Sequence, residues 1–326
     1  MYSMKAALLY GIGDLRVVET DVPKIGPNEI LAKVKACAVC PTDIRKYRTG
    51  DHMSIGFPMN LGHEWTGDVV ETGANIKRFR KGMRIIGADF AGYAEYAKIP
   101  ESYIKLGMVC KIPDDVSYEE GTFLEPMTDC LHAVKDQAKA KPGDTVAIIG
   151  AGQMGLQQLM VAKYVGATVI VSDMVEKRIE YAEKLGADHV INASKENPVQ
   201  AMERLTGGWG PDSVIVSIGQ PLAIEQGLKM VKKGGRVVIF GGAPEGTIVR
   251  LDPNIIHYGE VILTGSFWIG ATKTNLKLYK EALNLIASKR IPVAKLITHR
   301  FTLDEIHKAF QVQENKEGLK AIIIPP

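Results

Sequence analysis

The sequence predicts an α/β protein of two domains, one built from short β-strands and one from a doubly wound parallel sheet. Three observations predict this architecture. A chain of 326 residues is long enough for two domains that each bury a core. Short strand-like stretches, separated by Gly, Pro, Asn and Asp, fill the chain up to about Pro126. After Pro126, apolar strands alternate with helical stretches, which is typical of a parallel sheet covered on both faces.

The strand-like stretches of the first part are short and evenly spaced. They are KAALLY, LRVVET, EILAKVKACAV, TGDVVETG and YAEYAKI. Such spacing favours a β-barrel or a sandwich.

The alternating part begins with the strand DTVAIIG and the helix QMGLQQLMVAKYVGA. Three further pairs of strand and helix follow: TVIVSD with VEKRIEYAEKLGA, DHVINA with NPVQAMERLTG, and DSVIVSI with QPLAIEQGLKMVKKG. The strands RVVIFGGA and VILTGSF complete this part. Beyond Gly270, we expect a long amphipathic helix in TKTNLKLYKEALNLIASKR, then a short helix and a final strand in FTLDEIHKAFQVQENKEGLKAIIIPP. These last segments do not extend the alternation, so we expect them to return to the first domain.

The composition is that of an ordinary globular protein, with 46% hydrophobic and 24% charged residues. A net charge of +3, without long Lys/Arg runs, disfavours a nucleic-acid partner. Four cysteines are too few for a disulfide framework and fit a reducing compartment. The first residues have the features of neither a signal peptide nor a membrane span, so we expect a cytoplasmic protein without a membrane partner.

A glycine turn lies at the first strand-to-helix junction of the alternating part, where residues 150–155 read GAGQMG. This G-x-G-x-x-G follows a strand and opens a helix within a βαβ unit, which is the context that a dinucleotide site requires. Gly150 permits the tight turn, Gly152 lets the backbone approach a pyrophosphate, and Gly155 allows the helix to pack closely on the sheet.

Asp173 ends the second predicted strand, 18 residues after Gly155. A carboxylate there can accept hydrogen bonds from both ribose hydroxyls and would repel a 2′-phosphate, which favours NAD over NADP. Asp173 can also be the N-cap of the following helix. Lys177 and Arg178 either attract a 2′-phosphate or form a solvated helix face.

Cys40, His63 and Glu64 offer a thiolate, an imidazole and a carboxylate, a set that suits Zn²⁺. A further acidic candidate, Glu125, stands where the two predicted domains meet. The alternative for His63 is a histidine that merely packs. Cys37 with Cys40 forms C-x-x-C, but the βαβ context of a thioredoxin-like redox pair does not surround it.

Four motifs occur in order along the chain: C-x-T-D at 40–43, G-H-E at 62–64, E-P-x-x-x-x-x-H-A at 125–133 and G-x-G-x-x-G at 150–155. Together they resemble the zinc-dependent medium-chain alcohol dehydrogenases, and most of all the polyol branch with sorbitol, butanediol and threonine dehydrogenases. The resemblance runs over essentially the whole chain. It implies a GroES-like β-barrel catalytic domain of residues 1–126 and 271–326, a Rossmann NAD-binding domain of residues 127–270, and a homodimer or homotetramer.

The same resemblance implies roles for the metal candidates. Cys40 and His63 correspond to zinc ligands, and Glu64 is a direct ligand in the polyol branch. Glu125 is then a fourth ligand or acts through a bound water. Asp43 would orient His63, because a hydrogen-bonded imidazole is held in one tautomer.

The implied reaction is the reversible transfer of a hydride between a secondary alcohol or polyol and NAD, with Zn²⁺ as Lewis acid. Thr42 would accept the hydroxyl proton, and Glu64 or Glu125 could exchange with water on the metal. Phe267 and Trp268 would line the nicotinamide and substrate pocket, or be ordinary core aromatics. The remaining candidates for cofactor contact are Gln153, Met154, Arg178, Ser217 and Gly219.

Two departures from the family pattern change the expectation. No cysteine lies between Cys40 and Cys110, so the structural zinc of many relatives cannot form, and we expect one catalytic zinc. Arg45 stands where relatives often carry a proton-relaying histidine, and a guanidinium cannot act as that base. Arg45, within the run Arg45 to Arg48, could instead hold an anionic substrate group.

Several alternatives stay open on the sequence alone. The protein could work physiologically as a carbonyl reductase, or it could be a sugar-phosphate dehydrogenase of the same fold. It could also be a nucleotide-binding relative without turnover, which the Cys40, His63 and Glu64 set argues against. A zinc-binding interaction module would have a closed four-ligand site and no cofactor, which the glycine turn disfavours.

Overall fold

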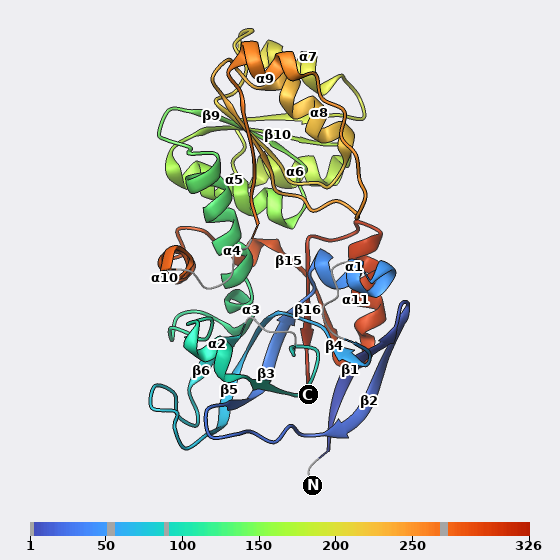
Figure 1. The fold of residues 1–326 in the computed structure, drawn as a ribbon, viewed down its shortest axis with the longest axis vertical. Helices are drawn as coiled ribbons and strands as arrows, with labels where there is room; N and C mark the ends of the chain where they lie inside the picture. The colour runs from blue at the N-terminus through green and yellow to red at the C-terminus, as the bar shows by residue number, and fades with distance from the viewer. Residues whose placement is uncertain (1–2, 51–55, 88–90, 268–272) are drawn as a thin grey trace. The chain divides into compact units, whose positions relative to one another are not determined.

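The computed structural model describes residues 3–50, 56–87, 91–267 and 273–326 (Figure 1). The chain divides into two compact units. The first comprises Met1–Pro126 and Gly270–Pro326, and the second comprises Met127–Ile269. No helix within the described ranges is long and apolar enough to cross a membrane.

The described residues of the first unit form two β-sheets. In the smaller sheet, β1 (Ser3–Gly11) lies between β2 (Asp14–Asp21) and β4 (Met59–Asn60). The larger sheet has the order β15-β16-β3-β5-β6-β8, and β7 pairs with β3. Its strands are β3 (Ile30–Ala38), β5 (Glu64–Thr72), β6 (Arg84–Gly87), β7 (Tyr96–Ile99), β8 (Cys110–Lys111), β15 (Ile297–Thr302) and β16 (Lys320–Ile324).

The larger sheet joins segments from both ends of the chain, because β16 pairs with β3. The predicted final strand therefore does return to the first unit. Its core gathers large apolar side chains from the β-strands and from the C-terminal helix, among them Trp65, Tyr93 and Phe310. All five strand-like stretches predicted before Pro126 contribute strands here.

Helices of the first unit cover and connect these sheets. They are α1 (Pro41–Thr49), α2 (Glu101–Lys105), α3 (Tyr118–Gly121), α10 (Lys273–Ala287) and α11 (Ile306–Glu314), with 3₁₀ segments at Val293–Leu296 and Leu303–Glu305. Helix α4 (Leu124–Leu131) begins in this unit, ends in the second, and continues as the π-helical segment His132–Gln137.

Helix α1, which carries several site candidates, was not predicted from the sequence. Pro41 occupies its first position, where the missing N–H is not needed, and Gly50 ends it in the left-handed conformation with φ 71°. An ion pair between Arg48 and Glu314 joins α1 to α11. The helix is thus fixed at both ends by the chain and along its side by α11.

The second unit contains the predicted parallel sheet, with strand order β11-β10-β9-β12-β13-β14. Every pair in it is parallel. The strands are β9 (Thr145–Ile149), β10 (Thr168–Asp173), β11 (His189–Asn192), β12 (Ser213–Val216), β13 (Arg236–Ile239) and β14 (Ile262–Gly265). This is the order of a doubly wound dinucleotide-binding sheet, and the chain direction across the sheet reverses between β9 and β12.

Helices alternate with these strands as predicted, and α9 is an addition that the sequence did not indicate. They are α5 (Gln153–Val165), α6 (Glu176–Lys184), α7 (Pro198–Leu205), α8 (Pro221–Met230) and α9 (Pro253–Gly259). Asn197 caps α7 through bonds from Val199 N and Gln200 N, and Asp252 caps α9.

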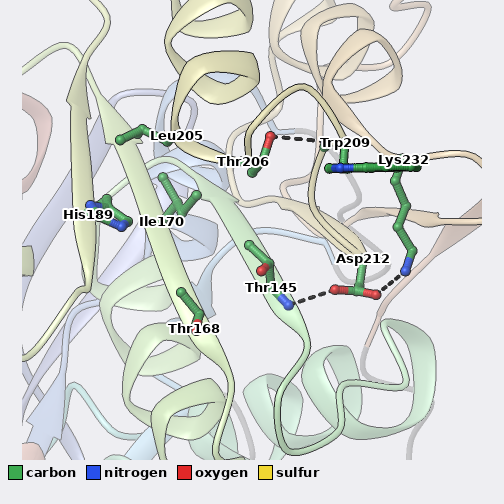
Figure 2. Close-up of a pocket in the computed structure, with 10 residues that line it drawn as sticks. Thr145, Thr168, Ile170, His189, Leu205, Thr206, Trp209, Asp212 and Lys232 are labelled. Carbon is green, nitrogen blue, oxygen red and sulfur yellow. Dashed lines mark hydrogen bonds and ion pairs between the residues drawn. The ribbon is translucent and has the colours of Figure 1, made fainter.

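A cavity of about 310 Å³ opens in the second unit at the amino ends of β9, β10 and β11 (Figure 2). The first residue of each strand lines it, namely Thr145, Thr168 and His189. Asp212 accepts a hydrogen bond from Thr145 N at 2.7 Å and pairs with Lys232. Because nucleotides bind at the carboxyl ends of such strands, this cavity is not the expected cofactor site.

Candidate active site

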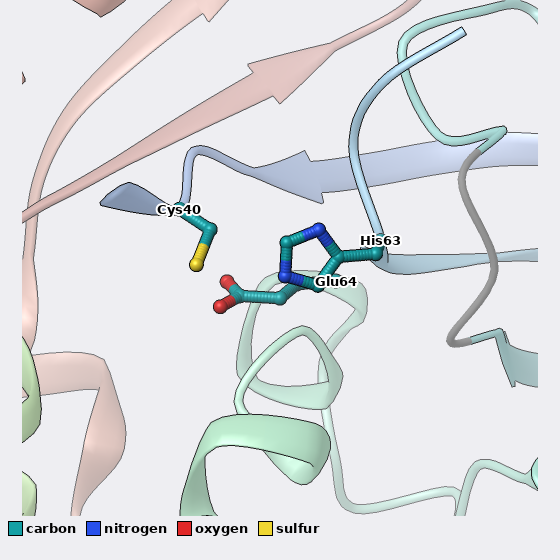
Figure 3. Close-up of side chains that lie close together, drawn as sticks. All are labelled: Cys40, His63 and Glu64. Carbon is teal, nitrogen blue, oxygen red and sulfur yellow. The ribbon is translucent and has the colours of Figure 1, made fainter. Parts of the chain in front are cut away.

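Cys40, His63 and Glu64 lie together where two paired strands meet. Strand β3 runs antiparallel to β5 in a register that sets Ala38 opposite Glu64. Cys40 follows β3 and directly precedes α1, whereas His63 directly precedes β5. One potential ligand atom from each of the three side chains lies within 4.8 Å of the others (Figure 3). The register of two strands therefore brings together three residues that the sequence separates by up to 24 positions.

The carboxylate of Glu64 is held in a fully buried ion pair. Its Oε2 accepts a hydrogen bond from Lys320 Nζ, and both side chains are 0% exposed. Its Oε1 is buried and has no hydrogen-bond partner within the described residues. A buried carboxylate oxygen without a partner is costly, and here it lies beside a thiol and an imidazole. Sulfur, nitrogen and oxygen donors at these distances fit a zinc ion, which would satisfy Oε1.

The imidazole of His63 is oriented from behind by Asp43. Its Nδ1 lies 3.3 Å from Asp43 Oδ1. Figure 3 shows the other ring nitrogen turned towards the Cys40 sulfur and the Glu64 carboxylate. Since the contact with Asp43 fixes the tautomer, Nε2 is the nitrogen that can bind a metal.

The charges of the site depend on one another. Burial raises the pKa of the Cys40 thiol, and the carboxylate of Glu64 raises it further. Burial opposes protonation of His63, but Asp43 and Cys40 together outweigh it and raise the His63 pKa well above its ordinary value. Both directions favour the protonated form of each group taken alone, and a metal ion that binds the thiolate and Nε2 must compete with protons.

Glu125, on α4, is not part of the three-residue cluster. It lies close enough for the charges of the cluster to shift its pKa. Burial raises its pKa to about 7, with Glu64 adding to the rise and His63 and Lys320 opposing it. The geometry thus offers Glu64 as the acidic ligand of the cluster. A role of Glu125 through a bound water stays a prediction.

The other candidates of the first unit lie on α1. Thr42 is half-buried in the first turn, two residues after Cys40, and Arg45 is half-buried about one turn later. In the basic run, Arg48 is paired with Glu314 and Lys46 is buried, so a role of Arg45 in holding an anionic group stays a prediction. Phe267, the last described residue before the gap at 268–272, is 80% exposed, and Trp268 lies outside the described residues.

The glycine turn of the second unit has the backbone that the motif predicts. Gly150 has φ 103°. A Cβ on Gly155 would come within 1.8 Å of Gly150 O, so a larger residue would break the packing of α5 on the turn. A Cβ on Gly152 would meet only the Arg178 guanidinium, at 3.9 Å. Gly152 therefore leaves open space at the start of α5, where a pyrophosphate would bind.

Asp173 binds two backbone amides beside the glycine turn, but the N-cap of α6 is Val175, so the N-cap alternative for Asp173 is wrong. Its Oδ2 accepts a hydrogen bond from Ala151 N of the glycine turn at 2.7 Å, and its Oδ1 accepts one from Val175 N at 2.9 Å. The carboxylate thus fixes the turn and the entry to α6. Each oxygen keeps a lone pair with which it can also accept a ribose hydroxyl.

Polar atoms without partners gather around this turn. Both polar side-chain atoms of Gln153 and the Nε of Arg178 are buried without a hydrogen-bond partner among the described residues. Ser217 follows β12 beside the turn, with its N bonded to Ile149 O at 2.8 Å. Met154 and Gly219 pack locally, since a Cβ on Gly219 would lie 2.0 Å from Gly242 O. Unpaired groups at the carboxyl ends of the strands are what a polar cofactor would satisfy.

Two residues at the metal cluster were missed by the sequence analysis. Lys320, which pairs with Glu64, opens the final strand, and a lysine at the start of a strand is usually solvent-facing. Tyr93, whose hydroxyl contacts Asp43, lies in a strand-like stretch with no motif around it. The only sequence signal for Lys320 was a lone charge at the head of the apolar run AIII.

Comparison with known proteins places the chain in a family. Residues 26–114 match the alcohol dehydrogenase GroES-like domain, and residues 140–288 match zinc-binding dehydrogenase. Sorbitol dehydrogenase of Ovis aries is 31% identical over 97% of this chain and 95% of its own. L-threonine 3-dehydrogenase of Bacillus velezensis is 31% identical over 94% of both chains.

Solved structures agree with these relatives. A zinc-binding dehydrogenase structure from Sinorhizobium meliloti 1021, bound to NADP, superimposes with a TM-score of 0.89 at 30% identity, over 100% of both chains. The chain therefore belongs to the zinc-dependent medium-chain dehydrogenases, in the branch of the sorbitol and threonine dehydrogenases.

Proposed function

We propose that this dehydrogenase converts a secondary alcohol or polyol into the ketone, reversibly, with one zinc ion and NAD. The observation that carries the proposal is the convergence of Cys40, His63 and the unpartnered Oε1 of Glu64 within 4.8 Å. A non-catalytic relative would not need to keep such a costly arrangement. The names of the relatives, sorbitol and threonine dehydrogenase, support substrates with a hydroxyl on a secondary carbon.

In the proposed mechanism, Cys40 Sγ, His63 Nε2 and Glu64 Oε1 would hold the zinc. When bound, zinc would supply a Lewis acid that lowers the pKa of the substrate hydroxyl and so favours release of hydride from its carbon. Thr42 would accept a hydrogen bond from the substrate hydroxyl and, as it takes that proton, give up its own towards the cofactor ribose and water. Arg45 cannot act as a base in this relay. Asp43 keeps His63 in the tautomer that presents Nε2.

The function is tested by screening the purified protein against polyols, amino alcohols and sugar phosphates with each nicotinamide cofactor. We expect reduced nicotinamide to absorb at its usual wavelength with a polyol or other secondary alcohol, and chelation of the metal to abolish the signal. Turnover confined to sugar phosphates would favour the alternative in which Arg45 binds an anionic group. Rates in both directions would separate an alcohol dehydrogenase from a physiological reductase. Full activity without metal would overturn the proposal.

We infer the domain roles in the same way. Residues 1–126 with 271–326 would form the GroES-like catalytic domain and residues 127–270 the NAD-binding domain, which the two compact units support. Strand β14 is the last strand of its sheet, and Ile262 on it is 46% exposed. The unpaired edge of a sheet can pair with a strand of a second copy. We therefore propose a homodimer or homotetramer. Light scattering of the purified protein would test the oligomeric state.

The preference for NAD is proposed on the charge of Asp173. In Asp173→Asn, the side chain keeps its shape and one acceptor oxygen, for Ala151 N of the glycine turn, but loses the acceptor for Val175 N and the charge that repels a 2′-phosphate. We expect the ratio of kcat/KM for NAD to that for NADP to fall roughly tenfold or more, a loss of about 1.4 kcal/mol of discrimination.

The matched control for this prediction is Asp188→Asn. Asp188 also accepts a backbone hydrogen bond in the same sheet, from Val169 N at 2.7 Å, but lies at the amino end of β11. The ratio should not change in this variant. An equal change in both variants, or an unchanged ratio in Asp173→Asn, would remove Asp173 from the cofactor assignment.

A further inference from the structure

Tyr93 is a fully buried tyrosine behind the metal cluster, with an exposed fraction of 0%. Its hydroxyl lies 2.9 Å from Asp43 Oδ2, and its ring packs edge-on against Phe310 at 6.0 Å. The backbone around it is bonded to the residues just before His63, through Gly92 N to Gly62 O at 2.8 Å and Tyr93 N to Leu61 O at 3.3 Å. Backbone hydrogen bonds thus join the segment of Tyr93 to residues 61–62, which directly precede His63.

Asp43 has four polar contacts, two on each oxygen, of which three are hydrogen bonds and the fourth is the close approach of the His63 ring. At Oδ1 they are Gly62 N at 3.1 Å and His63 Nδ1 at 3.3 Å. At Oδ2 they are Cys40 N at 3.2 Å and the Tyr93 hydroxyl at 2.9 Å. Among these four, Tyr93 makes the shortest contact and comes from a separate segment of the chain. A fully buried carboxylate needs such donors to stay ionised. The hydrogen bond from Tyr93 therefore contributes strongly to keeping Asp43 charged and in place.

The phenol of Tyr93 can only act as a donor here. Burial raises the Tyr93 pKa well above its ordinary value, and the charge of Asp43 raises it further, so the hydroxyl keeps its proton. The hydroxyl also lies 3.4 Å from Ala38 O, but the carboxylate is nearer and charged. The single proton therefore goes to Asp43.

The ring of Tyr93 acts on the same place by packing. Gly62, directly before His63, has φ 80°, and a Cβ there would lie 2.8 Å from Tyr93 Cδ1 and 2.8 Å from Cys37 Sγ. Tyr93 and Cys37 thus leave room only for glycine and fix the approach of the backbone to His63. The hydroxyl and the ring of Tyr93 thus both help to set the orientation of His63.

We propose that Tyr93 is a positioning residue of the metal centre. By fixing Asp43 against His63 Nδ1, it holds Nε2 in the direction that binds the cation and strengthens that bond. The inference rests on the proposed function, because it requires Cys40, His63 and Glu64 to bind a divalent ion. Loss of a hydrogen-bonding partner behind a metal ligand typically weakens metal affinity about 10–100-fold.

The test uses the full chain loaded with Co²⁺, whose visible absorption reports the ligand geometry and whose transfer to a chelator reports affinity. Tyr93→Phe removes one hydroxyl and keeps the ring. The control is Tyr118→Phe, because the Tyr118 hydroxyl also donates to a carboxylate of the first unit, Asp68 Oδ1 at 2.5 Å. We expect cobalt affinity to fall about 10–100-fold and the absorption bands to shift in Tyr93→Phe, with Tyr118→Phe within about twofold of wild type.

A second variant separates positioning from packing. In the Asp43→Asn background, adding Tyr93→Phe should cause no further loss of cobalt affinity, since the residue acts through the carboxylate. An equal loss in both backgrounds, or unchanged cobalt binding in Tyr93→Phe, overturns the proposal. A wild-type cobalt spectrum that is unaffected by Cys40→Ala would instead overturn the metal centre, and with it this role of Tyr93.

Discussion

Cys40→Ala is expected to lose both bound zinc and at least about a thousandfold in kcat/KM, which is roughly 4 kcal/mol of transition-state stabilisation. Removing the thiolate leaves the ion one imidazole and one carboxylate that is already shared with Lys320. Zinc content by atomic emission and NAD-linked turnover measure the two effects. Cys110→Ala is the control, because Cys110 lies outside the cluster on β8, and it should keep zinc and activity.

The pH dependence of metal retention follows from the same thiol. Its pKa is raised in the metal-free protein, so zinc must displace a proton to bind. Lowering the pH strengthens that competition, and zinc should therefore transfer to a chelator more readily as the pH falls. Transfer that is independent of pH would mean that neither Cys40 nor His63 loses a proton on binding, contrary to the assignment.

Lys320→Met is expected to destabilise the metal-free protein by about 3–5 kcal/mol, because it leaves a buried carboxylate without its counter-charge. Glu64 loses its ion-pair partner, and Glu125 loses a nearby positive charge that opposes the rise of its pKa. The free energy of unfolding in urea measures the effect. In zinc-loaded protein the loss should be smaller, since the cation supplies the missing charge.

Two further variants make this prediction specific. Lys5→Met breaks an exposed pair with Asp304, whose side chains are 41% and 59% exposed, and should cost no more than about 1 kcal/mol. Adding Glu64→Gln to Lys320→Met removes the unpaired charge and should recover much of the stability. A Lys320→Met protein as stable as Lys5→Met would show that the buried pair contributes little to folding.

The sequence predicted the parts of this protein whose signals are local. The glycine turn and the alternation of strands and helices each depend on neighbours within about 20 residues, and the sheet order and backbone of the second unit agree with them. Cys40 and His63 are farther apart, but a known pattern of motifs linked them. The short helices α1 and α9 were missed because each spans about two turns and lacks a clear apolar period.

The charge balance of the metal cluster could not be predicted in this way. Lys320 reaches Glu64 across 256 positions, through the pairing of β16 with β3 and of β3 with β5. A one-residue slip in either register would place Lys320 and Glu64 on opposite faces of the sheet. Tyr93 likewise meets Asp43 only after the segment around residue 92 has paired with residues 61–62. Such contacts are properties of the register and not of any motif.

The position of Lys320 on the last strand also sets an order of assembly on the ribosome. Cys40, His63 and Glu64 are synthesised early, whereas their buried counter-ion emerges only after the entire nucleotide-binding unit. Chains are synthesised from the N-terminus at about 5–20 residues per second. Lys320 is therefore added on the order of ten seconds or more after Glu64. A nascent chain in that interval has the carboxylate of Glu64 without its lysine and the edge of β3 without its partner β16.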